Sequence, residues 1–156
     1  GLTLATTPAE MYRAILESTA FGTYTIIRQL EQGGVPISEL YACGGLPGKN
    51  PLLMQIFSDV TNREIRVAAS DQTVALGSAM FGAVAAGVEA GGYANITEAA
   101  KKMARLRDTV FRPNKEAHAA YEKIYAIYLR LHDLFGRKGG DAAMKELKAI
   151  RHSFHS

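Results

Sequence analysis

The stretch YACGGLPGKNPLLMQ, residues 41–55, combines residue types that proteins use to bind nucleotides. The double glycine Gly44-Gly45 leaves the backbone bare, so that a ligand can approach it closely. Lys49 offers a cation, and the pair Asn50-Pro51 is typical of the first residues of a helix. The segment therefore fits a phosphate loop, a platform for another part of a ligand, or a simple turn between a strand and a helix.

The residue types exclude the two common phosphate motifs. A Walker loop ends in Gly-Lys-Ser/Thr, because successive N–H groups wrap the phosphates and the hydroxyl binds magnesium. Here Asn50 stands at the hydroxyl position, and Pro47 has no N–H group. Gly44 and Gly45 are adjacent, so the dinucleotide pattern Gly-x-Gly-x-x-Gly is also absent. Two interpretations stay open: a backbone platform for a flat ligand, and a plain turn capped by Asn50.

The rest of the chain offers no constellation for catalysis. A nucleophile needs a nearby base, and a metal needs ligands at short spacings such as His-Glu-x-x-His. The histidines show no such spacing, and the single cysteine excludes a cysteine cluster. We therefore expect no catalytic residue and no metal ligand in this chain, and exposed or edge positions for His118, His132, His152 and His155.

Hydrophobic spacing and capping residues predict an α/β order of elements. Helices are expected over 7–33, 50–62, 70–87, 95–106, 114–135 and 141–151, and short strands over 39–45 and 64–70. An α/β sheet with crossover helices follows from this order. Because two strands do not form an independently stable sheet, we expect the rest of this α/β sheet to come from elsewhere.

The spacing of apolar residues also predicts which helix faces are covered. The first helix is expected to carry a stripe of Met11, Ile15, Thr19, Gly22, Ile26 and Leu30. The helix over 50–62 is expected to turn Leu53, Ile56, Phe57 and Val60 inward. The helix over 114–135 is expected to present a core-facing seam of Ala117, Tyr121, Ile124, Tyr128, Leu131 and Phe135.

Length and charge favour one compact domain, residues 1–136, followed by a basic helical tail, residues 137–156. The tail holds five basic residues against two acidic ones, which accounts for the whole net charge of +3. A solvated tail helix explains this better than nucleic-acid binding, so no nucleic-acid partner is expected. No apolar run is long enough to cross a membrane, and the lone Cys43 is typical of a cytoplasmic protein.

The order of motifs resembles the C-terminal domain of the FGGY carbohydrate kinases, the family of glycerol, xylulose, gluconate and ribulose kinases. The strings that carry this resemblance are GGLPGKNPLLMQIFSDVTNREIRV and QTVALGSAMFGAVAAG. The opening residues, with EMYRAILE at 10–17, resemble the latter part of the family's second signature. Further strings, GGY, EAAKKMAR and YAIYLRLHDLFGR, resemble a ketopentose-phosphorylating member.

The resemblance implies a partial ribonuclease-H-like domain of the actin and sugar-kinase superfamily, with a helical C-terminal extension. It implies ATP and Mg²⁺, a ketopentose substrate, the remainder of the same polypeptide as a partner, and a homodimer. It also implies that the backbone at Gly44 and Gly45 lies against adenine and ribose, and that the Asn50 side chain reaches the nucleotide. The catalytic base is expected upstream of this chain.

Two other functions fit the residues. The chain could be a non-catalytic regulatory domain that keeps the fold and has lost nucleotide affinity. It could also bind nucleic acid through the basic tail, in which case binding would weaken steeply with salt.

Overall fold

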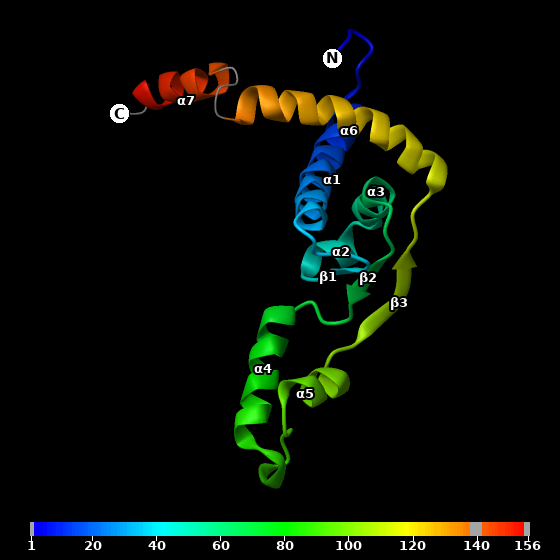
Figure 1. Cartoon of the computed structure of the whole chain (residues 1–156), viewed down its shortest axis with the longest axis vertical. Helices are drawn as coiled ribbons and strands as arrows, with labels where there is room; N and C mark the ends of the chain where they lie inside the picture. Colours follow the sequence, from blue (N-terminus) through cyan, green and yellow to red (C-terminus); the bar gives the residue numbers. More distant parts are fainter. Residues whose placement is uncertain (1, 138–141, 155–156) are drawn as a thin grey trace. The chain divides into compact units, whose positions relative to one another are not determined.

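The computed structural model describes residues 2–137 and 142–154, and combines helices with a small sheet (Figure 1). Residues Gly1–His118 and Ala119–Ser156 form two compact units, which are described separately. The predicted boundary between residues 136 and 137 stays a prediction, and Lys138 and Asp141 of the predicted tail lie outside the described residues. The elements are α1 (Pro8–Gln32), β1 (Leu40–Ala42), α2 (Gly45–Lys49), α3 (Pro51–Thr61), β2 (Ile65–Ala68), α4 (Thr73–Ala86), the 3₁₀ turn η1 (Val88–Ala90), α5 (Ile96–Met103), β3 (Leu106–Phe111), α6 (Lys115–Gly136) and α7 (Ala143–Ser153).

The sheet has the order β1-β2-β3. β1 is parallel to β2, with Leu40 opposite Ile65, and α3 is part of the crossover between them. The predicted α/β architecture is thereby confirmed. The sequence did not predict β3, which pairs antiparallel with β2. This third strand belongs to the chain itself, so the expectation that all further strands come from elsewhere is wrong. The helix predicted over 95–106 ends instead at Met103, so that Leu106 begins a strand.

The start of α1 follows from local hydrogen bonding. Glu10 N donates to Thr7 Oγ1 at 3.3 Å, and Thr7 N donates to Glu10 Oε2 at 2.7 Å. Each residue thus satisfies a backbone N–H group that the first turn leaves without a helical partner. Pro8 occupies the first turn, where its missing N–H group does no harm. The predicted capping box is confirmed.

The stripe predicted for α1 lies on the wrong face. Its larger residues are exposed, with Ile15 at 61% and Ile26 at 63% of full exposure. α1 packs beside α3 (Figure 1), and its buried residues are Leu16, Ala20, Phe21, Tyr24 and Ile27. Both sets follow helical spacing, so the helix has two apolar faces and periodicity alone does not say which is covered.

α3 forms the centre of the core. Asn50 Oδ1 accepts a hydrogen bond from Leu53 N at 3.0 Å and so caps its first turn. Asn62 ends the helix in the left-handed conformation, with φ of 54°, as predicted. The predicted inward residues Leu53, Ile56 and Val60 are buried. Phe57 is half-buried.

Arg63 connects the end of α1 to the end of α3 through hydrogen bonds and an ion pair. Its guanidinium donates to the carbonyl oxygens of Ile37 at 2.8 Å and Thr61 at 2.5 Å, and forms an ion pair with Glu31. The side chain is only 16% exposed. One guanidinium group thus satisfies two backbone carbonyl oxygens and one carboxylate.

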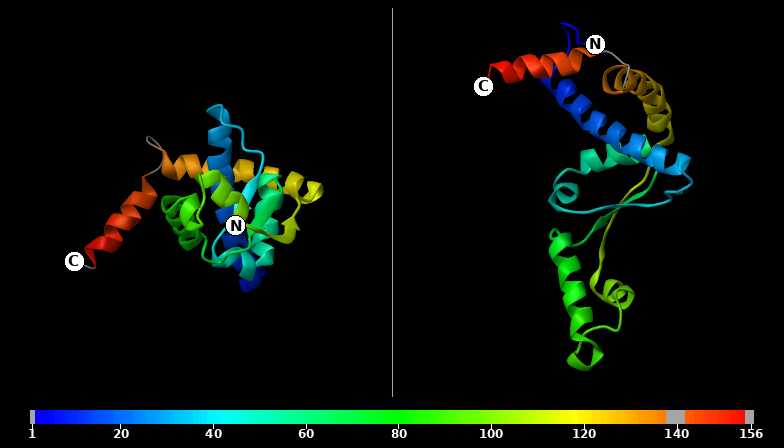
Figure 2. Two further views of the ribbon diagram at one scale, coloured as in Figure 1. Left: turned by 90° about the horizontal axis from the view of Figure 1, so that it is seen from below. Right: turned by 60° about the vertical axis from the view of Figure 1, so that its left-hand side comes forward.

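α4 and α5 lie next to each other (Figure 2). The helix predicted from residue 70 begins at Thr73, because the Ser70 hydroxyl accepts a hydrogen bond from Gln72 N instead of capping a helix. Its end at Gly87 is confirmed. A Cβ added to Gly92 would lie 1.9 Å from Ala83 O, so glycine is required where the chain returns to α4.

α6 begins as predicted, because Asn114 Oδ1 accepts from the N–H groups of Glu116 and Ala117. Its predicted core-facing seam is wrong beyond the first turns. Tyr121 is buried, but Ile124 and Leu131 are exposed at 46% and 52%. Tyr125, outside that seam, is buried instead. Among the described residues, no helix combines the length and apolar character needed to cross a membrane.

Candidate functional site

The glycine turn lies at the carboxyl end of β1, directly before α2. Gly44 has φ of 90° and ψ of −176°, a conformation that only glycine adopts without strain. The chain therefore turns sharply after Ala42 and enters α2 at Gly45. In α/β sheets this edge, beyond the carboxyl ends of the strands, is where ligands commonly bind.

Gly45 differs from Gly44 because its backbone conformation does not require a glycine. Its φ is not positive, and an added Cβ would meet no atom within 4 Å. Neither strain nor packing in the described chain therefore requires a glycine here. The residue is exposed, so its backbone is open to a ligand.

Asn50 is half-buried and links α2 to α3. Its Oδ1 is engaged in the cap of α3, and its own N–H group donates to Leu46 O at 3.1 Å. A contact from this side chain to a ligand would therefore use the Nδ2 amide group. The structure places Gly44 and Gly45 at the start of the short helix α2 and Asn50 at its end. The sequence predicted a strand as far as residue 45 and then a turn, so it missed this helix, and β1 ends already at Ala42. The binding role of the three residues stays a prediction.

Arg107 also lies at this turn, and the sequence did not link it to the site. It sits on β3, and its guanidinium approaches Gly48 of α2. Nothing local predicts this contact, because Gly48 and Arg107 are far apart in the sequence and Arg107 belongs to a strand that was not predicted.

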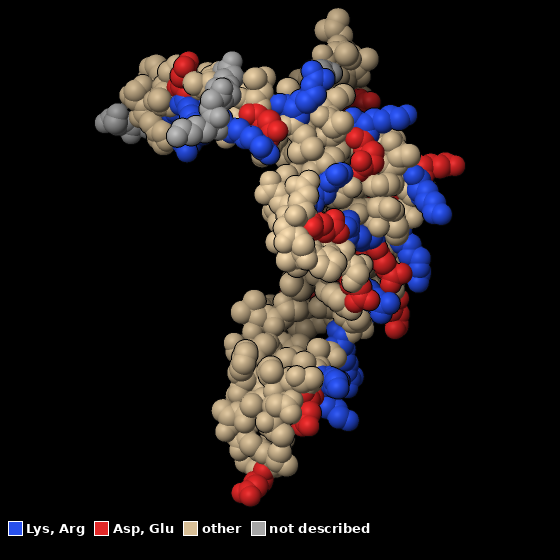
Figure 3. All heavy atoms as spheres, in the orientation of Figure 1, with Lys and Arg blue, Asp and Glu red and all other residues tan. Residues whose placement is uncertain are grey.

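α4 is the most apolar surface near the end of β2. None of its residues is charged, and Met80 is its only buried residue. Val74 and Phe81 are exposed at 85% and 66%, and the uncharged surface is visible in Figure 3. The small residues Ala75, Gly77 and Ala79 leave room for a neighbouring backbone, and in the described chain a Cβ on Gly77 would meet nothing within 4 Å.

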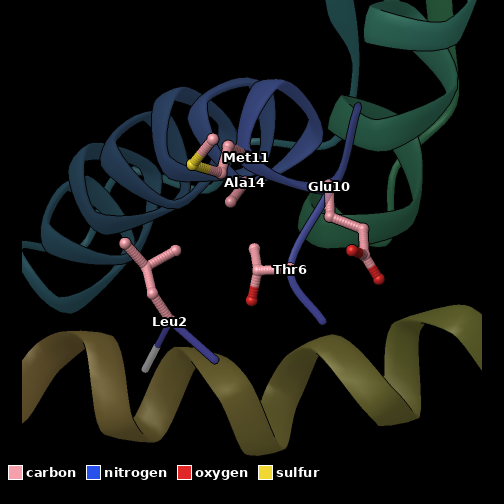
Figure 4. Close-up of a pocket in the computed structure, with 5 residues that line it drawn as sticks. All are labelled: Leu2, Thr6, Glu10, Met11 and Ala14. Atoms are coloured by element: carbon pink, nitrogen blue, oxygen red, sulfur yellow. The ribbon is translucent and has the colours of Figure 1, made fainter. Parts of the chain in front are cut away.

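A hollow of about 410 Å³ lies beside the first turn of α1, where Leu2, Thr6, Glu10, Met11 and Ala14 surround it (Figure 4). The Glu10 carboxylate is already engaged by Thr7, and these two hydrogen bonds lower its pKa below the ordinary value. The hollow therefore offers little unengaged polarity to a ligand.

Two of the described histidines have close polar neighbours, whereas His152 is exposed on α7. His118 Nδ1 lies 2.9 Å from Asp59 O, and His132 Nδ1 lies 3.1 Å from Asp133 Oδ1. The contact with His132, together with Arg137, lowers the pKa of the Asp133 carboxyl. In residues 2–137 and 142–154, no three His, Cys, Asp or Glu side chains are grouped as metal ligands. His155 lies outside the described residues.

The chain belongs to the FGGY family of carbohydrate kinases, because the model of that family's C-terminal domain matches residues 1–86. Ribulokinase from Halalkalibacterium halodurans is 61% identical over 155 residues, which are 99% of this chain and 27% of the relative. Ribulokinase from Geobacillus thermodenitrificans is 59% identical over 148 residues, 95% of this chain and 26% of the relative. The chain thus spans about a quarter of the length of these curated relatives.

Solved structures confirm the predicted sugar-kinase fold. Ligand-bound xylulose kinase from Lactobacillus acidophilus matches 85% of this chain and 26% of its own, with a TM-score of 0.72 and 24% identity. Glycerol kinase from Plasmodium falciparum, solved with ADP, matches 88% of this chain and 26% of its own, with a TM-score of 0.65 and 24% identity.

Proposed function

We propose that this chain is the C-terminal, nucleotide-binding part of an ATP-dependent L-ribulokinase. The enzyme would convert L-ribulose to L-ribulose 5-phosphate in L-arabinose catabolism, in the cytoplasm. The 61% identity to a ribulokinase supports this choice of sugar over that of a xylulokinase.

The observation that carries the nucleotide role is the open backbone at Gly45. A glycine that neither strain nor packing explains, at the carboxyl end of a strand, fits a position where a flat ligand lies against the main chain. We propose that Gly44 and Gly45 contact adenine and ribose, and that the Nδ2 amide of Asn50 donates to the nucleotide.

Phosphoryl transfer depends mainly on positioning and on neutralising charge. In this proposal the chain fixes the adenosine end of ATP, and so determines where the γ-phosphate lies. The catalytic base, the phosphate contacts and the Mg²⁺ site come from the rest of the kinase polypeptide. Magnesium would neutralise the phosphate charge there.

We also propose that the rest of the polypeptide completes the sheet. β1 is an edge strand of only three residues, and such an edge presents unpaired backbone groups. A hollow of about 210 Å³ lies beside it, with an almost wholly apolar lining of Thr23, Leu40, Tyr41, Ala42, Met54, Phe57 and Ile65. An added strand would fill this hollow and pair with β1.

A homodimer stays a prediction, which sedimentation velocity of the full-length protein would test.

Calorimetric titration of the full-length kinase with ADP tests the nucleotide site. Gly45→Arg should abolish or greatly weaken binding, because its side chain would occupy the space in front of the turn. Gly136→Arg is the matched control, since its Cβ would also meet nothing within 4 Å. Unchanged ADP binding in Gly45→Arg would contradict the site.

Steady-state kinetics with L-ribulose and D-xylulose test the sugar. The proposal expects a higher kcat/KM for L-ribulose. A preference for D-xylulose would favour the xylulokinase alternative, and no turnover with intact ADP binding would favour a regulatory domain.

A further inference from the structure

Arg107 lies at an irregularity in the pairing of β2 with β3. Arg66 is opposite Val110 and Ala68 is opposite Leu106, so three β3 residues, Arg107 to Thr109, face Val67 alone. Extra residues of this kind bend a strand and redirect a side chain, and they are common beside active sites. Here the redirected side chain is that of Arg107.

The guanidinium is held by the segment that joins β2 to α4. Arg107 Nη2 is 2.7 Å from Asp71 Oδ1, and Nε donates to Ala68 O at 3.4 Å. The two contacts involve different nitrogens, so they fix the orientation of the planar group as well as its position.

The same guanidinium lies against α2 at Gly48. A Cβ added to Gly48 would be 2.9 Å from Nη1, 3.0 Å from Nη2 and 3.1 Å from Cζ. Only a residue without a side chain therefore leaves the guanidinium in place. Gly48 is exposed and its φ is not positive, so its glycine is explained by Arg107 rather than by strain.

Apart from the contact with Arg107, the packing of α2 against the sheet is incomplete. A hollow of about 90 Å³ separates part of α2 from β2 and β3, and it is lined by Pro47, Gly48, Pro51, Val67, Arg107, Thr109 and Phe111. Because this space is not filled by side chains, the contact with Arg107 is important in setting the position of α2.

We propose that Arg107 is a positioning residue for nucleotide binding. It acts through Gly48, and holds α2 so that the backbone at Gly44 and Gly45 keeps its binding geometry. Asp71 in turn holds the guanidinium. The inference rests on the proposed nucleotide site, and it assigns Arg107 no contact with the nucleotide itself.

A double-mutant cycle in the full-length kinase tests this coupling. Arg107→Ala should raise the KM for ATP about two- to fivefold, the size expected for a partly exposed ion pair, and leave kcat and the sugar KM nearly unchanged. Gly48→Ala should also raise the KM for ATP, because its methyl group displaces the guanidinium. In the Arg107→Ala background, Gly48→Ala should have no further effect, since the three nearest atoms to its methyl group belong to Arg107.

Arg112→Ala is the matched control. Arg112 follows β3 and pairs with Glu64 at 3.3 Å, but it is 72% exposed, so its loss should leave the KM for ATP unchanged. Arg107→Lys keeps the charge beside Asp71 and loses the planar group, so it should restore the KM for ATP only in part.

Three outcomes would overturn the inference. The first is an unchanged KM for ATP in Arg107→Ala while Gly45→Arg abolishes ADP binding. This result would support the proposed nucleotide site but contradict the role of Arg107. The second is strict additivity of Gly48→Ala and Arg107→Ala, which would show that they act separately. The third is equal loss of kcat and sugar affinity, which would indicate a general structural role. Unchanged nucleotide binding in Gly45→Arg would instead contradict the proposed function, on which the inference rests.

Discussion

The carboxylate of Asp59 accepts a hydrogen bond from the backbone N–H of Asn114 at 2.8 Å, although 55 residues separate them. The same Oδ1 atom accepts from Gln55 Nε2 at 2.8 Å, and Asp59 is only 8% exposed. Gln55 Nε2 also donates to Arg112 O at 2.8 Å. One buried carboxylate thus joins α3 to the segment that leads from β3 into α6.

Asp59→Ala should lower the free energy of unfolding by about 2 kcal/mol, because the Asn114 N–H group and the Gln55 amide would lose the carboxylate that they share. Asp59→Asn keeps an oxygen acceptor and should be less destabilising. Chemical denaturation of the purified protein measures both. Asp108→Ala, at an exposed position, is the control and should have little effect.

Arg63→Met should destabilise the protein by about 2 kcal/mol, since it removes hydrogen bonds to Ile37 and Thr61 as well as the ion pair with Glu31. Methionine retains much of the apolar length of the side chain. Arg66→Met serves as the comparison, because Arg66 is 45% exposed and pairs only locally with Glu64. Equal thermal unfolding of the two variants would contradict the role given to Arg63.

Gly44→Ala and Gly45→Ala should differ in their effect on folding stability. Gly44→Ala should lower the free energy of unfolding by about 1–3 kcal/mol, because alanine is strained at its φ of 90°. Gly45→Ala should leave stability nearly unchanged, since its Cβ meets nothing. Denaturation without nucleotide measures the stability of each variant, and ADP titration then measures its nucleotide binding. A large stability loss in Gly45→Ala would mean that packing explains this glycine after all.

The Glu10 carboxyl should titrate below its ordinary pKa, because it accepts hydrogen bonds from the Thr7 backbone and hydroxyl. A lowered folded-state pKa means that the contribution to stability is present above the unfolded-state value. It is lost as pH falls through the folded-state value. NMR titration of Glu10 in the native protein and in Thr7→Ala tests this, and an unchanged pKa in that variant would be inconsistent with the capping box.

The elements that the sequence predicted correctly have local signals. Thr7 with Glu10 starts α1, Asn50 starts α3, and Asn62 ends it in the left-handed conformation. Such signals require only neighbouring residues, so a sequence displays them directly. The turn at Gly44 and Gly45 was found in the same way.

The features that the sequence missed are not local. β3 lacks the alternation of buried and exposed residues that marks a strand, because its irregular pairing interrupts the pattern between Arg107 and Thr109. On α1 and α6, more than one apolar stripe has helical spacing, and only the tertiary structure shows that Leu16 and Tyr125 are buried while Ile15 and Ile124 are exposed. The contact of Arg107 with Gly48 depends on the missed strand, so it could not be anticipated.

The uncharged surface of α4 also determines how the purified chain would behave. Val74 and Phe81 are exposed on a helix that carries no charge to keep molecules apart, and β1 offers an edge for intermolecular pairing. An isolated chain with both features is prone to aggregate. Because hydrophobic association weakens on cooling, its colloidal stability should improve in the cold.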